Sequence, residues 1–253
     1  MQGLVQDEVV QSTAGRRRLA GVAAVDAALS AEAAVRCLLL RDAGVGERSQ
    51  ALAERAEASG IPVHRIAPRR FERLCGPDRD VDVLALSGPD PGAELEVVMA
   101  RPGAVWLLTG PSYPGNVGFA IRTAEVSGAD GLYVDNDFDH AARREAVRAA
   151  MRADRFMPVG WRDAAEVLDA ARAAGKRVIG IEDVGHEPPW RVDLSGPVVF
   201  VVGGEADGVP PDVLERCDSV TRLPMAGFVA SYNLQAAVAA IALERLRQTE
   251  EPS

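Results

Sequence analysis

The chain of 253 residues has few of the residues that build disulfide frameworks or metal sites. It has three cysteines and three histidines, scattered along the sequence without the spacing of a metal site or a disulfide framework. We therefore expect a reducing, cytoplasmic location and no bound metal. No apolar run approaches the roughly 20 residues that span a bilayer. The N-terminal segment MQGLVQDEVV is too acidic and polar for a secretory signal.

Lysine is nearly absent, because Lys176 is the only one among 28 basic residues. Asp and Glu number 37, so the formal net charge is −9, which excludes a general polyanion binder. Any nucleic-acid site must therefore be a local patch, and arginines would give it planar, bidentate contacts with anions. The apolar content of 47% and the charged content of 26% are ordinary for a globular protein and exclude a disordered or coiled-coil chain.

Several common sequence motifs are missing as well. The sequence has no complete GxGxxG, which excludes the usual dinucleotide fingerprint, and no glycine loop followed by GK[ST], which excludes a nucleotide-hydrolysing phosphate loop. It also has no GxSxG, the nucleophile turn of α/β hydrolases. The chemistry of this chain must therefore lie elsewhere.

Strand-like and helix-like segments alternate along the chain and predict an α/β fold. The segment 88–94 (GPDPGAE) breaks every pattern, and we place a boundary within 88–100, with a small α/β domain at 1–97 and a second domain at 98–253. Continuous β-branched runs separated by helices predict a parallel sheet covered on both faces in the second domain. The expected strands are 35–40, 61–66, 81–86, 105–109, 131–135, 176–182, 197–203 and 219–224. The expected helices are 21–30, 47–60, 117–128, 141–152, 163–174 and 231–248.

Three loops follow strands of this sheet, where α/β proteins bind ligands. In the first loop, Asn116 is placed to cap a helix, and Arg122 in the second turn indicates an anion or hydroxyl partner. In the second loop, a Gly-Gly pair precedes Glu205. A carboxylate directly after a buried strand costs folding free energy unless it has a hydrogen-bond or ion-pair partner. In the third, Ser231 is expected to cap the long C-terminal helix.

The three loops, in this order and spacing, resemble the three motifs of the SPOUT superfamily, specifically its SpoU-TrmH class of RNA ribose 2′-O-methyltransferases. The resemblance covers about 105–247, and residues 1–97 resemble, more weakly, a ribosomal-protein-like substrate-binding domain. It implies a C-terminal trefoil knot, S-adenosyl-L-methionine (AdoMet) as cofactor, and a homodimer with the active site built across the subunit interface. No metal is implied.

The resemblance also assigns residues. The polar active-site positions are Asn116, Arg122, Glu205, Ser231 and Asn233. The positions expected at the cofactor are Thr109, Gly203, Gly204, Gly208, Leu223, Met225, Gly227 and Tyr232. Arg122 would act as the base commonly proposed for the family, or would clamp a phosphate and stabilise the developing alkoxide. Asn116 would orient Arg122 or the ribose, and Glu205 would fix Arg122 or a loop.

Arginine clusters supply the basic surface that RNA would need. Arg144, Arg148, Arg152 and Arg155 recur at helical spacing and predict one positive stripe, with a solvated helix face as the alternative reading. A second cluster in the first domain includes Arg69 and Arg70.

The sequence departs from the family pattern at Ser112, at Ala150-Met151-Arg152 and at Tyr232. These departures indicate a specialised member. The N-terminal domain favours ribosomal RNA of the 23S type over transfer RNA as substrate. A catalytically silent RNA-binding dimer and a small-molecule methyltransferase remain as alternatives.

Overall fold

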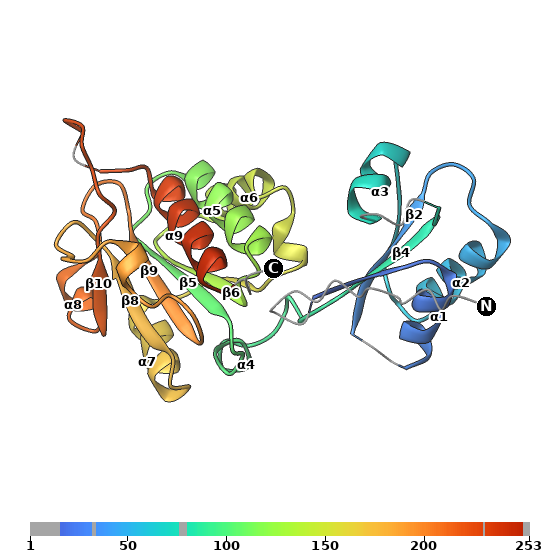
Figure 1. Ribbon diagram of the computed structural model, residues 1–253, viewed down its shortest axis with the longest axis horizontal. Helices are drawn as coiled ribbons and strands as arrows, with labels where there is room; N and C mark the ends of the chain where they lie inside the picture. The colour runs from blue at the N-terminus through green and yellow to red at the C-terminus, as the bar shows by residue number, and fades with distance from the viewer. Residues whose placement is uncertain (1–15, 32–33, 76–79, 230, 250–253) are drawn as a thin grey trace, which may run out of the picture. The chain divides into compact units, whose positions relative to one another are not determined.

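The computed structural model describes residues 16–31, 34–75, 80–229 and 231–249. The chain forms two compact units, Met1–Asp90 and Pro91–Ser253 (Figure 1). The units part inside the segment where the sequence places a boundary, but before residue 97. The short helix α4, Leu95–Met99, therefore belongs wholly to the second unit. Among the described residues, none of the helices combines the length and the apolar composition that a membrane span requires.

The first unit contains a four-stranded mixed sheet in the order β1-β4-β2-β3. Strand β4 is antiparallel to both neighbours, whereas β2 and β3 are parallel. The core lies between this sheet and two helices, and the side chains of Leu38 and Leu40 on β2 are completely buried in it. The sequence analysis missed β1 and α3. The elements are β1 (Arg17–Ala20), α1 (Val22–Ser30), β2 (Val35–Arg41), α2 (Glu47–Ala58), β3 (Val63–Ile66), α3 (Pro68–Cys75) and β4 (Val83–Ser87).

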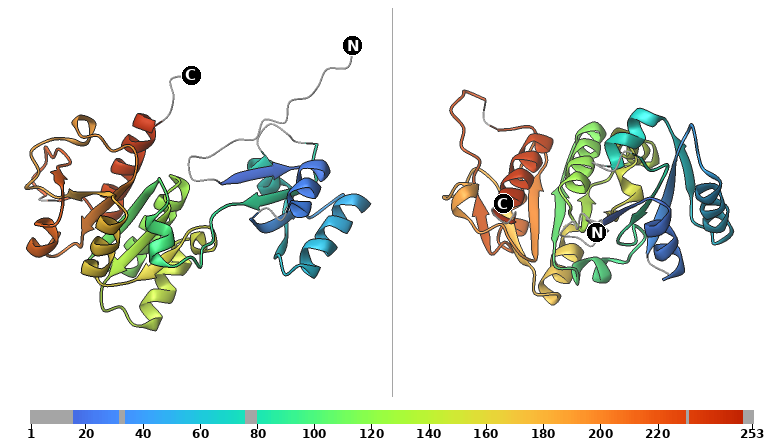
Figure 2. Two further views of the ribbon diagram at one scale, coloured as in Figure 1. Left: turned by 90° about the horizontal axis from the view of Figure 1, so that it is seen from below. Right: turned by 45° about the vertical axis from the view of Figure 1, so that its right-hand side comes forward.

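The second unit contains a six-stranded sheet in the order β10-β8-β9-β5-β6-β7, and every pairing in it is parallel. Two buried clusters cover its faces: one includes α5 and α9, and the other includes α4, α7 and α8. Figures 1 and 2 show α9 beside α5. The predicted α/β fold with a parallel sheet covered on both faces is confirmed. The strands are β5 (Ala104–Thr109), β6 (Gly131–Asp135), β7 (Val159–Trp161), β8 (Arg177–Ile181), β9 (Val198–Gly203) and β10 (Ser219–Thr221). The helices are α5 (Pro114–Val126), α6 (His140–Ala149), α7 (Ala164–Ala173), α8 (Pro211–Leu214), α9 (Leu234–Thr249) and the 3₁₀ turns η1 (Ala153–Arg155) and η2 (Pro189–Arg191).

The chain takes an unusual route after the central strand β9. It runs out to the edge strand β10 and then returns to α9, which packs against α5 and β9. At the end of β10, Thr221 pairs with Ile181 on one side and bridges to Glu187 on the other. The Thr221 hydroxyl donates to the Glu187 carbonyl at 2.8 Å. The loop after β8 therefore surrounds the end of β10.

Helix α6 ends earlier than the sequence predicts. Met151 and Arg152 have φ angles of 54° and 66°, in the left-handed region, so the helix cannot continue past Ala150. The expected single helical stripe of Arg144, Arg148, Arg152 and Arg155 is therefore wrong, because only the first two lie on α6.

Candidate active site

The first two loops interlock at the carboxyl ends of β5 and β9. The Gly204 N–H donates to the Thr109 carbonyl at 2.7 Å. A Cβ added at Gly204 would lie 2.0 Å from the carbonyl oxygen of Gly110, and a Cβ added at Gly203 would lie 2.0 Å from the backbone of Gly208. Only glycine fits such close backbone contacts. These glycines therefore shape the loops, whatever ligand the loops hold.

Glu205 joins the second loop to the first. Its Oε1 accepts a hydrogen bond from Asn116 Nδ2 at 2.6 Å, and its Oε2 accepts one from the Ser112 N–H at 2.9 Å. The carboxylate is thus partnered, as its position after a buried strand requires. Of the two roles considered for Glu205, the structure shows the fixing of a loop. No contact with Arg122 is present within the described part of the chain.

Asn116 is not the cap of α5. The N-cap position is Tyr113, and Pro114 occupies the first helical position, which suits a residue without an N–H. Asn116 lies inside the first turn, so its side chain is available to donate to Glu205. The expected N-cap role is therefore wrong, because the helix begins before residue 116.

Arg122 stands apart from this pair. It is exposed on α5, and within the described residues no group hydrogen-bonds to its guanidinium. Arg122 lies six positions after Asn116 on the helix, so the two side chains point about 120° apart around the axis. Asn116 therefore does not orient Arg122 in this structure. The guanidinium is left with its full set of donors for an external anion.

The third loop runs from Arg222 to Asn233. Asn233, not Ser231, caps α9, because Asn233 Oδ1 accepts from the Gln235 N–H at 3.0 Å and the helix begins at Leu234. The expected cap at Ser231 is therefore wrong. Ser231 is exposed. The hydroxyl of Tyr232 donates to the Pro224 carbonyl at 2.9 Å and closes the neck of the loop.

The other positions expected at the cofactor differ in their exposure. The Thr109 hydroxyl is buried and donates to the Val202 carbonyl inside the sheet, so only the backbone of Thr109 faces the loops. Leu223 packs against the core, whereas Met225 and Gly227 are exposed. Within the described part of the chain, no backbone N–H from Leu223 to Val229 donates a hydrogen bond. Unpaired main-chain donors beside a glycine cradle fit a cofactor that is held by backbone groups.

Two acidic residues that the sequence analysis missed also shape the site. Glu182, directly after β8, accepts from the Val209 N–H at 2.8 Å and fixes the far end of the second loop. Asp135, the last residue of β6, accepts from the Ala164 N–H at 3.0 Å, and burial raises the pKa of its carboxyl. Each lies at the carboxyl end of a buried strand, the same signal that singled out Glu205.

The predicted RNA-binding arginines are exposed, at Arg144, Arg148, Arg152 and Arg155 in the second unit and at Arg69 and Arg70 on α3. Arg143 beside them is different, because its Nε donates to the Phe138 carbonyl and its guanidinium lies over the Trp161 ring. Each unit therefore presents its own exposed basic cluster.

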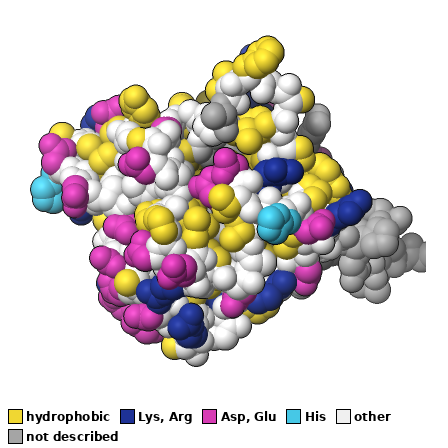
Figure 3. Space-filling view, turned by 90° about the vertical axis from the view of Figure 1, so that its left-hand side faces the viewer, with side chains coloured by type: hydrophobic (Ala, Val, Ile, Leu, Met, Phe, Trp, Pro, Cys, Tyr) yellow, Lys and Arg dark blue, Asp and Glu magenta, His cyan; other side chains and the backbone are white. Residues whose placement is uncertain are grey.

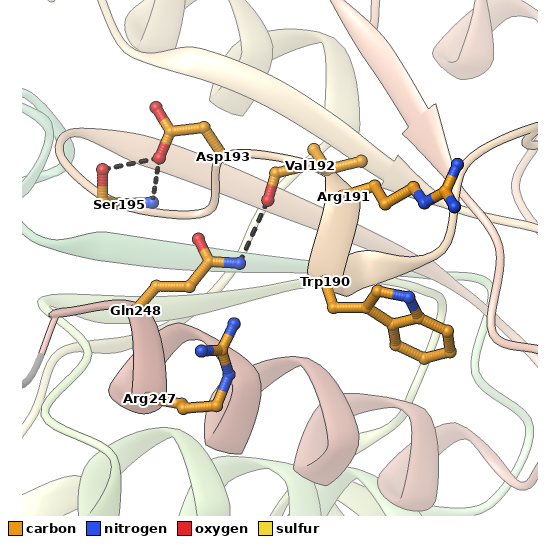
Figure 4. A pocket seen from close by; sticks show the side chains of 7 residues that line it. All are labelled: Trp190, Arg191, Val192, Asp193, Ser195, Arg247 and Gln248. Carbon is orange, nitrogen blue, oxygen red and sulfur yellow. Dashed lines mark hydrogen bonds between the residues drawn. The ribbon is translucent and has the colours of Figure 1, made fainter.

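A pocket of about 420 Å³ lies away from the three loops, between η2 and the C-terminal end of α9 (Figure 4). Its polar groups bind one another: Asp193 Oδ1 accepts from the Ser195 N–H and hydroxyl, and Gln248 Nε2 donates to the Val192 carbonyl. The hydrogen bond between Gln248 and Val192 at this pocket holds the C-terminal end of α9 in place. In the described ranges, no three His, Cys, Asp or Glu side chains gather as metal ligands.

Comparisons with known proteins identify the family of this chain. The model of the SpoU rRNA Methylase family matches residues 104–243. The 23S rRNA (guanosine-2′-O-)-methyltransferase RlmB of Pseudomonas aeruginosa is 31% identical over 90% of this chain and 95% of its own length. The protein of the same name from Xanthomonas axonopodis pv. citri is 30% identical over 91% of this chain and 96% of its own.

Solved structures are similar over almost the whole chain. The SpoU methyltransferase AviRb from Streptomyces viridochromogenes, in complex with the cofactor AdoMet, has 26% identity and a TM-score of 0.57, covering 93% of this chain and 91% of that one. The AdoMet-bound rRNA methyltransferase from Sinorhizobium meliloti has a TM-score of 0.59 at 22% identity, covers 93% of this chain and 88% of that one, and supports the fold. The chain therefore belongs to the SpoU rRNA methylase family.

Proposed function

We propose that this chain is an AdoMet-dependent methyltransferase that methylates a ribose 2′-hydroxyl of ribosomal RNA of the 23S type. Relatives named 23S rRNA (guanosine-2′-O-)-methyltransferase match along almost their whole length, which supports the reaction and the substrate. The observation that carries the proposal is the hydrogen-bonded junction of the first two loops by Glu205 and Asn116 at the carboxyl edge of the sheet. Arg122 is exposed farther along α5.

AdoMet, when bound, supplies a methyl group that is already strongly electrophilic. The task of the protein is to align the 2′-hydroxyl with that methyl group, and alignment can supply on the order of 7–11 kcal/mol of the barrier. Glu205 and Asn116 hold the loops in register for this purpose. Ser231 and Asn233 lie at the start of α9, where Asn233 caps the helix and the exposed Ser231 hydroxyl is available to the ribose.

Arg122 serves in our proposal as a clamp for the phosphate next to the reacting ribose. A guanidinium stays protonated and is a poor base, but it stabilises a developing alkoxide and an adjacent phosphate. The phosphate would then take the proton from the hydroxyl. Arg122 acting directly as the base is the alternative.

Backbone groups of the second and third loops would hold the cofactor. We assign this role to Gly203, Gly204, Gly208, Leu223, Met225, Gly227, Tyr232 and the backbone of Thr109. The glycine cradle and the unpaired N–H groups of the third loop support the assignment.

A homodimer is part of the proposal. Phe119 and Val126 on α5 and Leu243 on α9 are exposed by 47%, 75% and 67%. Large apolar side chains on two neighbouring helices are typical of a surface covered by a second copy. The trefoil knot is proposed as well, and the contacts of Thr221 with β8 on one side and with Glu187 of the following loop on the other support it.

Phosphate contacts are assigned to Arg144, Arg148, Arg152 and Arg155 in the second unit and to Arg69 and Arg70 in the first. All six are exposed. With a net charge of −9, the chain needs such local clusters to approach RNA. Ribosomal RNA as substrate places the protein in the cytoplasm.

Tritiated AdoMet offered with ribosomal RNA and with transfer RNA tests the function. We expect label in ribosomal RNA, little in transfer RNA, and loss of at least a hundredfold in Arg122→Ala. Calorimetry with AdoMet separates an enzyme from a silent RNA-binding dimer, which has no need of cofactor affinity. AdoMet binding without transfer to any RNA would contradict the proposal, and sedimentation velocity checks the dimer.

A further inference from the structure

The aromatic side chains of this chain are distributed unevenly between core and surface. There are twelve, namely six Phe, three Tyr and three Trp, and all lie in the described residues. Five of them are exposed, and three of these belong to the first and third loops. Tyr113 is exposed by 62%, Tyr232 by 51% and Phe228 by 110%, more than in the extended reference chain.

The two loops bring these rings to one edge of the sheet. Tyr113 is the residue immediately before α5, and Tyr232 lies two residues before α9. Both helices begin at the carboxyl edge of the sheet and pack side by side (Figure 1). This is the edge at which Glu205 meets Asn116.

The third loop carries Phe228 at its tip, and a hydrogen bond closes the base of the loop. The hydrogen bond from the Tyr232 hydroxyl to the Pro224 carbonyl closes the neck of the loop, and Phe228 lies midway between these two residues. Nothing lies within 4 Å of the position that a Cβ on Gly227 would take, so the tip stands in open space. Hydrophobic side chains end the projection at the top of the space-filling view (Figure 3).

The segments that carry these rings contain no charged side chains, which bears on the kind of ligand they can bind. Residues 102–121 and 223–243 contain no Asp, Glu, Lys or Arg. These segments therefore neither repel a polyanion nor attract it through side-chain charge, and their exposed rings offer a contact that needs no charge. Unpaired RNA bases stack on such rings regardless of sequence, whereas bases inside a duplex are not accessible to them.

We propose that Phe228, on the loop closed by Tyr232 and at the same edge of the sheet as Tyr113, forms a stacking platform for unpaired bases next to the target ribose. The proposal rests on the proposed function and extends it, because it specifies a single-stranded region of the RNA as the substrate. The hydroxyl of Tyr232 positions the loop, and the ring of Phe228 makes the contact. Stacking then supplies affinity that a chain of net charge −9 cannot draw from its overall field.

The test compares two labelled probes with the full-length protein, by fluorescence anisotropy. One is a 12-residue oligouridine, and the other is a ribose-phosphate oligomer of equal length and charge without bases. We expect Phe228→Ala to weaken binding of oligouridine about tenfold, to leave binding of the abasic oligomer unchanged and to keep the slope of log K against log salt. Phe228→Trp should retain binding. Trp190→Ala, which removes an exposed ring away from the loops, is the matched control and should bind as wild type does.

Equal weakening for both probes would overturn the proposal, as would no weakening for either. If sedimentation velocity instead shows that Phe228→Ala changes the oligomeric state, the ring packs against a second copy and the platform is wrong. Methyl transfer by the wild-type protein is measured separately. If the wild-type protein transfers methyl groups and Phe228→Ala binds oligouridine as tightly as wild type does, only the stacking platform is rejected. If the wild-type protein transfers no methyl group, the proposed function is rejected.

Discussion

Gly204 is the residue at which the first two loops come closest. A side chain there would have its Cβ 2.0 Å from the Gly110 carbonyl, and both partners are backbone, so neither can turn aside. We predict that Gly204→Ala abolishes AdoMet binding in calorimetry, because the loops must separate. Gly115→Ala is the control, since nothing lies within 4 Å of its Cβ position on α5. AdoMet binding by Gly204→Ala at wild-type affinity would show that the cradle does not hold the cofactor.

The contact between Asn116 and Glu205 gives a second prediction at this scale. Asn116→Asp replaces a 2.6 Å hydrogen bond by two facing carboxylates, which repel each other and open the first loop. Methyl transfer should fall at least tenfold at pH 8 and recover partly as the pH is lowered, when the pair takes up a proton. Ser112→Ala is the control, because Glu205 binds the backbone N–H of that residue. A pH profile of Asn116→Asp parallel to that of wild type would contradict this account.

At the scale of elements, the end of α6 stores backbone strain. Met151 has φ 54° and is exposed by 67%, so glycine there would relieve the left-handed conformation and lose few contacts. We predict that Met151→Gly raises the free energy of unfolding by about 1 kcal/mol. Urea denaturation measures this change. Ala149→Gly, at the last residue of α6, should instead lower it by up to about 1 kcal/mol, and destabilisation by both variants would mean that the turn is not strained.

Lys176 connects two further elements, because its Nζ, one residue before β8, donates to the carbonyls of Arg101 and Gly103 before β5. Burial lowers the pKa of its ammonium to about 8, against 10.5 for the exposed group. Between these values the unfolded chain binds more protons, so stability should rise with pH from about 8 to 10.5. Burial also raises the pKa of Tyr133 and of Cys217, which titrate at alkaline pH in both proteins. Lys176→Met lacks the rise due to Lys176, so the difference between the two plots of unfolding free energy against pH isolates Lys176. A difference that is constant with pH would contradict the prediction.

The sequence predicts those elements whose periodicity is strong. The central strands β5, β6 and β9 and the helices α5 and α7 lie within a few residues of their expected ranges. Strand β7 is missed because it has only three residues, one of them glycine, and owes its place to pairing with β6. The end of α6 could not be predicted, since two non-glycine residues with positive φ leave no local signal.

Some features of the candidate site can be predicted from the sequence, and others depend on contacts that only the fold creates. Glu205 stands out because a carboxylate after a buried strand needs a partner, but its partners lie on another loop and only the fold brings them together. The separation of Asn116 from Arg122 follows from helical geometry, whereas the cap at Asn233 depends on where α9 begins.

At the scale of the whole molecule, an acidic chain is proposed to act on a polyanion. Its net charge of −9 is compatible with that role because the six assigned arginines are exposed in local clusters and the first and third loops carry no acidic residue. Phosphate contacts should therefore set the salt dependence of RNA binding, and the loops should set its selectivity.

The most direct test of the central claim is the chemical position of the transferred methyl group on ribosomal RNA. RNA labelled by the full-length protein is digested to nucleosides, and the label is located on sugar or base. Our account predicts a single 2′-O-methylated nucleoside in 23S rRNA, with the label lost in Arg122→Ala. Label on a base, or undiminished ribose labelling by Arg122→Ala, would contradict it.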